Sequence, residues 1–140
     1  MQAWERIHIN WEIKGKPVLM LTFHASGALN RMGDGSGDKA VSRLCMGHGD
    51  PAWFTILLQE LGEDALDLVG RYEFPDPQGD KAVLSIVLSK EEEETGFEFT
   101  YGTESVGPPE EMVNWVELAV NLSHDWWEEQ LFKGKQRRKK

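Results

Sequence analysis

Cysteine is nearly absent from the chain, since Cys45 is the single one among 140 residues. An intrachain disulfide is therefore excluded, as is typical of proteins in a reducing compartment. Long apolar runs are also missing, because no segment approaches the roughly 18 consecutive apolar residues that a membrane-spanning helix needs. The first residues lack the apolar core of a secretion signal. We therefore expect a cytoplasmic protein that contacts no membrane.

Sequence motifs for cofactors and metals are missing too. The chain has neither the dinucleotide pattern GxGxxG nor the Walker pattern GxxxxGK[ST]. Cys45 and His48 are half of a zinc site, and no second Cys/His pair follows at a suitable spacing. Asp34 and Asp38 have the spacing of calcium ligands, but Lys39 occupies the position that an EF-hand reserves for glycine. We therefore expect no cofactor and no bound metal.

Basic residues are scarce in most of the chain and concentrated at its end. Six of the 15 Lys and Arg lie within residues 133–140, so residues 1–132 carry 24 acidic against 9 basic side chains, a formal net charge of −15. An acidic body repels phosphate backbones, so we expect no nucleic-acid binding except through the tail. We expect one domain over residues 1–132, a size that folds around a single core, and a disordered basic tail over 133–140.

The hydrophobic periodicity indicates an α+β fold. Alternating apolar residues predict strands at 7–13, 28–32, 72–74, 82–88 and 97–101, and a run apolar on both faces predicts a central strand at 18–23. Asp50 and Pro51 predict a helix start, and Pro108 and Pro109 predict another. This second helix either runs to about Phe132 or restarts near Ser123. The expected order is βββα-βββα, with a mainly antiparallel sheet of about six strands and both helices on one face.

The two halves of the chain show a weak sequence similarity. Lysine and apolar residues within 16–23 align without gaps on those within 81–88. Trp53 and Trp115 follow at similar distances in the two halves. An internal duplication explains this pattern, and so does chance resemblance between two amphipathic strands.

The segment 30–51 is the first candidate for a ligand site, because it is rich in glycine and gathers polar side chains. Long irregular segments in compact domains are often functional. Its candidate ligand-binding residues are Arg31, Asp34, Asp38, His48 and Asp50. A loose cation site, a phosphate cradle and a solvated turn are the alternatives. No nucleophile stands beside an oriented base, so no catalytic residue is assigned.

Tryptophan is abundant, with six in the chain. Trp126 and Trp127 are neighbours on a predicted helix and point about 100° apart, so burying both needs a wide apolar face. An exposed Trp4, Trp126 or Trp127 would mark a protein-binding patch. The alternative is that all three are covered by neighbouring elements.

Two hypotheses about function follow from these patterns. The leading one is a non-catalytic protein-binding module, of an adaptor, inhibitor or immunity type, whose acidic body attracts another protein that is itself basic. The alternative is a small-ligand or metal-dependent enzyme that uses the Gly/Asp-rich segment 30–51. The sequence specifies neither the oligomeric state nor the strand order.

Overall fold

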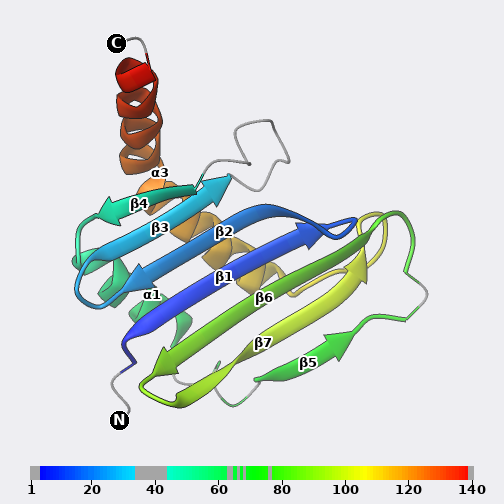
Figure 1. The fold of residues 1–140 in the computed structure, drawn as a ribbon. Helices are drawn as coiled ribbons and strands as arrows, with labels where there is room; N and C mark the ends of the chain where they lie inside the picture. The colour runs from blue at the N-terminus through cyan, green and yellow to red at the C-terminus, as the bar shows by residue number, and fades with distance from the viewer. Residues whose placement is uncertain are drawn as a thin grey trace.

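The computed structural model describes residues 4–33, 44–62, 65, 67, 69–75 and 77–138, with side chains up to residue 132. Its elements form one mixed sheet and two helices (Figure 1). In chain order they are β1 (Arg6–Ile13), β2 (Lys16–His24), β3 (Ala28–Gly33), β4 (Leu44–His48), α1 (Ala52–Leu61), β5 (Gly70–Glu73), β6 (Lys81–Lys90), β7 (Glu93–Gly102) and α3 (Glu110–Arg138).

Turn chemistry fixes the first hairpin. Lys14 and Gly15 connect β1 to β2, and both have positive φ, 57° and 75°. Two consecutive residues with positive φ form the turn whose twist matches that of the flanking strands. The resulting register places Ile9 beside Leu21 and Ile7 beside Phe23. The apolar residues of the two strands therefore share one face.

The sheet has seven strands in the order β4-β3-β2-β1-β6-β7-β5. The α+β class is confirmed, but the prediction of about six strands is inexact because β4, within the glycine-rich segment, was not expected. The sheet is mixed, since β5 pairs parallel to β7 while the other pairs are antiparallel. The expected order βββα-βββα becomes four strands and a helix, then three strands and a helix, among the described residues.

The proposed duplication does not extend to the topology. Residues that align in sequence, Leu21 and Ile86, do flank the same residue of β1, Ile9. However, β1 pairs with β2, whereas β5, its counterpart in the second half, lies at the sheet edge beside β7. The first strands of the two halves therefore occupy different positions.

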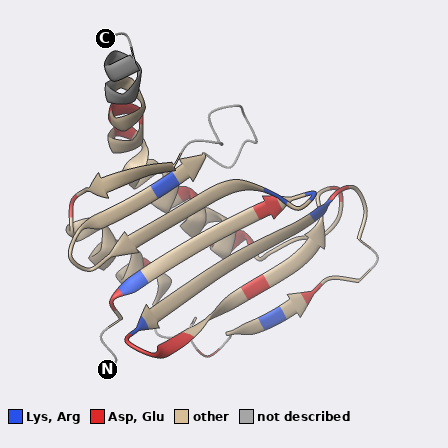
Figure 2. Ribbon diagram, in the orientation of Figure 1, with Lys and Arg blue, Asp and Glu red and all other residues tan. Residues whose placement is uncertain are grey.

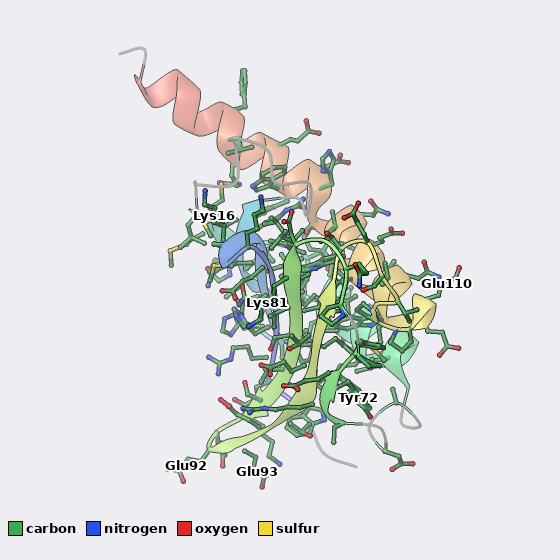
Figure 3. The ribbon with its side chains drawn as sticks, turned by 90° about the vertical axis from the view of Figure 1, so that its right-hand side faces the viewer. Lys16, Tyr72, Lys81, Glu92, Glu93 and Glu110 are labelled. Carbon is green, nitrogen blue, oxygen red and sulfur yellow. The ribbon has the colours of Figure 1, made fainter. Side chains whose placement is uncertain are left out.

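Both described helices lie on the same side of the sheet, which Figures 1 and 3 show from two directions. The helix α1 begins where predicted, because Asp50 Oδ1 accepts a hydrogen bond from the Ala52 amide at 2.9 Å. The indole Nε1 of Trp115 on α3 donates to the Leu57 carbonyl of α1 at 2.8 Å. This bond joins the two helices over the core.

The helix α3 is continuous and does not restart at Ser123. It ends at Arg138, so the helix extends into the basic segment that begins at residue 133. The last turns extend beyond the edge of the sheet (Figure 1). In the part of the chain that the structure describes, no helix combines the length and apolarity needed to cross a membrane.

Candidate functional site

Alternation along the strands gives the sheet two different faces. On β1, Ile7 and Ile9 are fully buried beneath the helices, while His8 between them points the other way. We call the face without helices the open face. Its side chains, assigned by strand register, are Arg6, His8, Asn10, Glu12, Met20, Thr22, His24, Ala28, Asn30, Met32, Leu44, Met46, His48, Val83, Ser85, Val87, Ser89, Glu94, Glu98 and Thr100.

The centre of the open face carries no charged side chain. Arg6 and Glu12 lie at opposite ends of β1. The charged residue of β3 is Arg31, whose side chain belongs to the other face of the sheet. Figure 2 accordingly shows charge at the strand ends, along β7 and β5 and in the β6–β7 hairpin, with little on β2 and β4. A neutral area therefore lies at the centre of a protein of formal net charge −9.

Apolar side chains are exposed at one side of this area. On the edge strand β4, the side chains of Leu44 and Met46 are 51% and 66% exposed. Leu44 pairs with Met32, which in turn pairs with Met20. These four residues form an apolar strip across β4, β3 and β2. Sequence analysis missed the strip, although its members recur at outward positions of three strands.

His8, on β1 beside the strip, stays neutral at physiological pH. The imidazole Nδ1 of His8 lies 2.7 Å from Thr22 Oγ1, within hydrogen-bond distance. Burial, and secondarily the charge of Arg6, lowers the pKa of His8 below its ordinary value. Because that pKa is lowered, His8 is uncharged at pH 7 and the centre of the open face remains neutral.

Arg31, a predicted ligand residue, lies on the opposite face and is fully buried under α3. Its Nε donates to the Gly33 carbonyl at 2.9 Å, and its Nη1 donates to the Val120 carbonyl at 3.0 Å and to Ser123 Oγ at 3.1 Å. Its guanidinium carbon lies 4.3 Å from the centroid of the Trp127 ring. These contacts anchor α3 to β3, which is a structural role.

The remaining residues of the predicted loop site are not brought together with Arg31. His48 belongs to the open face, so its side chain and that of Arg31 point to opposite sides of the sheet. Asp50 accepts the Ala52 amide at the start of α1. Asp34 and Asp38 lie outside the described residues. The expected pocket that unites these side chains is therefore not formed by Arg31, His48 and Asp50.

The tryptophans expected to form a surface patch are buried. Trp126 and Trp127 are 8% and 5% exposed, and Trp4 also belongs to the core. Trp126 Nε1 donates to the His48 carbonyl at 3.0 Å, while Arg31 covers the ring of Trp127. The wide apolar face that two adjacent tryptophans require is thus supplied by β4 and β3. Their burial removes the exposed tryptophan surface on which the predicted partner contacts depended.

A cavity of about 400 Å³ lies at the other end of the sheet, near β5 and β7. Tyr101 lines it, and its hydroxyl accepts a hydrogen bond from Trp11 Nε1 at 2.7 Å. Burial raises the pKa of Tyr101, and the bond from Trp11 opposes that rise. Because its pKa is raised, the phenol stays protonated and is a poor general base.

Metal-ligating side chains do not cluster within the described ranges, which contain no group of three or more His, Cys, Asp or Glu that could hold an ion. Comparison with protein-family models, curated proteins and solved structures finds no match to this chain. The open face, defined by its own geometry, is therefore the strongest candidate for a functional surface.

Proposed function

We propose that the chain is a non-catalytic protein-binding module whose open face contacts a basic protein. The observation that carries this proposal is the neutral centre of the open face in a chain of formal net charge −9. The chain carries 24 acidic and 15 basic residues, so the absence of charge from the middle of a broad sheet face is a distinctive property of this surface.

The composition of the open face supports this proposal. The buried centres of protein interfaces are depleted in charged residues and enriched in methionine. Met20, Met32 and Met46 lie on neighbouring strands, and the flexible thioether of methionine adapts to irregular partner surfaces. The other face of these strands packs on the core, through residues such as Leu21 and Leu29. A fixed backbone with adaptable side chains suits a docking surface.

The charge around the neutral centre indicates the chemistry of the partner. Glu12 lies at one end of β1, Glu98 lies on β7, and residues 91–94 place acids in the β6–β7 hairpin, while the basic Arg6 and Lys90 lie at the corner where β1 begins and β6 ends. A partner with an apolar centre and surrounding Lys and Arg complements this distribution. The negative net charge also steers a basic partner during diffusional encounter.

The alternative hypothesis, an enzyme that uses residues 30–51, gains no support from the geometry. Arg31 and His48 point to opposite faces of the sheet, and Asp50 accepts the Ala52 amide at the start of α1. Neither arrangement places a nucleophile beside a base.

Site-specific crosslinking identifies and tests the partner. A photoreactive amino acid replaces Met46 in one sample and Val106, which is 76% exposed in the connection before α3, in another. We expect a protein that is captured from position 46 and not from position 106. The captured protein is then purified and its affinity is measured by calorimetry.

Charge variants provide the decisive comparison. Met46→Lys places a buried charge in the interface and repels a basic partner, so we expect an affinity at least tenfold weaker. Val106→Lys adds the same charge outside the open face and should leave the affinity unchanged. Equal effects of the two variants would refute the proposal. Light scattering of the free chain is a further check, because a dimer that Met46→Lys dissociates would identify the occupant as a second copy.

A further inference from the structure

A second concave site lies at the corner of the open face where β1 begins and β2 and β6 end. Arg6 of β1 pairs with His24 of β2 on one side and with Ser89 of β6 on the other. Arg6 Nε donates to Ser89 Oγ at 2.8 Å, and Ser89 is buried. A buried hydroxyl therefore holds the exposed guanidinium in place through one of its nitrogens.

The corner forms an open, shallow cavity of about 290 Å³, lined by Glu5, Arg6, His24, Ser89, Lys90 and Glu91. Within the described part of the chain, neither Arg6 nor Lys90 forms an ion pair. Burial, and then the charge of Arg6, lowers the pKa of His24. The neutral imidazole of His24 is thus a hydrogen-bonding group close to Arg6 and Lys90.

We propose that this corner pocket binds a small carboxylate. The planar guanidinium of Arg6 matches a carboxylate in a two-bond arrangement, and Lys90 adds a second positive charge. Glu5 and Glu91 line the same cavity and bring the formal charge of its lining to zero, so a carboxylate is held by the directed hydrogen bonds of Arg6 and not by net positive charge, and a polyphosphate is repelled by the two acids. The ligand is a free small acid or the carboxyl terminus of a peptide, which share this chemistry. The corner belongs to the open face, but the assignment rests on its own contacts and does not depend on the protein-binding function proposed above.

Nuclear magnetic resonance titration tests the assignment with defined probes. N-acetylalanine carries the carboxylate, and N-acetylalaninamide is its neutral control. We expect saturable shifts at Arg6, His24, Ser89 and Lys90 with the acid and none with the amide. The pKa of His24 should rise in the bound state, because the carboxylate offsets the charge of Arg6.

Matched charge variants separate the pocket from general electrostatics. Arg6→Gln should weaken N-acetylalanine binding at least tenfold. Lys16→Gln removes the same charge from the other end of β2, whose nine residues span roughly 26 Å. Figure 3 shows Lys16 at the opposite end of the sheet from Glu92 and Glu93 in the β6–β7 hairpin, which follows Lys90. If Arg6→Gln impairs folding, as judged by thermal unfolding, Lys90→Gln replaces it.

Several outcomes would overturn the proposal: shifts that do not saturate, equal weakening by Arg6→Gln and Lys16→Gln, or inorganic phosphate binding tenfold more tightly than N-acetylalanine. Once binding is established, the affinity for acetate is compared with the affinity for N-acetylalanine to distinguish a free acid from a peptide terminus. Equal affinity for acetate and N-acetylalanine supports a free acid, and a tenfold preference for N-acetylalanine supports a peptide terminus.

Discussion

Two adjacent residues on β2 offer a direct comparison of the two sheet faces. Leu21 is fully buried beneath the helices, and Met20 lies half-buried on the open face. Leu21→Ala removes apolar contacts and leaves a cavity, and such a substitution of a buried leucine lowers the free energy of unfolding by about 3 kcal/mol. Met20→Ala removes a side chain that stays partly hydrated, so we expect a loss of about 1 kcal/mol. The difference corresponds to about 30-fold in the unfolding equilibrium.

Urea denaturation followed by tryptophan fluorescence measures both losses. For a chain of this size, with an m-value of about 2 kcal/mol/M, Leu21→Ala should lower the midpoint by about 1.5 M. Met20→Ala should lower the midpoint by about 0.5 M. Equal losses for the two variants would refute the two-faced sheet, because Met20 would then be covered as completely as Leu21.

Three further predictions address polar and close-packed positions. Burial and the charge of Arg6 lower the pKa of His8 in the folded state, so the unfolded chain takes up a proton at a higher pH and the free energy of unfolding falls as the pH drops below about 6.5. His8→Gln should reduce this loss of stability between about pH 7.5 and about pH 5, measured by urea denaturation at each pH. An unchanged dependence of the unfolding free energy on pH would contradict the prediction. Gly96→Ala places a methyl group against the Ile86 carbonyl oxygen, so we expect the free energy of unfolding, measured by thermal unfolding, to fall by more than about 3 kcal/mol. A decrease below about 1 kcal/mol would show that β6 and β7 separate easily at this position. Trp115→Phe removes the hydrogen bond to the Leu57 carbonyl and should lower the free energy of unfolding by about 1 to 3 kcal/mol, measured by urea denaturation. An unaltered free energy of unfolding would contradict this prediction.

The strands with clear alternation were predictable from the sequence. In β1 and β6, the apolar residues repeat at every second position and face the helices in the structure. The strand β4 was missed because its five residues include Gly47 and follow a glycine-rich segment. Gly47 packs closely there, since a Cβ at position 47 would lie 3.3 Å from the Trp126 ring and would require the ring to shift. That constraint comes from tertiary packing and leaves no periodic signal.

The candidate site was less predictable than the fold. Arg31 interrupts an apolar stripe and was interpreted as a ligand residue. In the structure it is buried, and it donates hydrogen bonds to Val120 and Ser123, which lie 89 and 92 positions further along the chain. The apolar run at 18–23 was correctly assigned to a strand. Its outward residue Met20 belongs to the open face, which becomes recognisable when the register joins it to Met32 and Leu44. Contacts between distant segments define both features.

Methionine oxidation, measured by mass spectrometry in the free chain and in the complex with the crosslinked partner, examines the central proposal most directly. In the free chain, peroxide should oxidise the exposed Met46 much faster than the buried Met112 of α3. If the open face binds the partner, oxidation of Met46 and Met32 should slow at least tenfold in the complex while Met112 is unchanged. Equal oxidation rates of Met46 in the free and bound states would contradict the proposal.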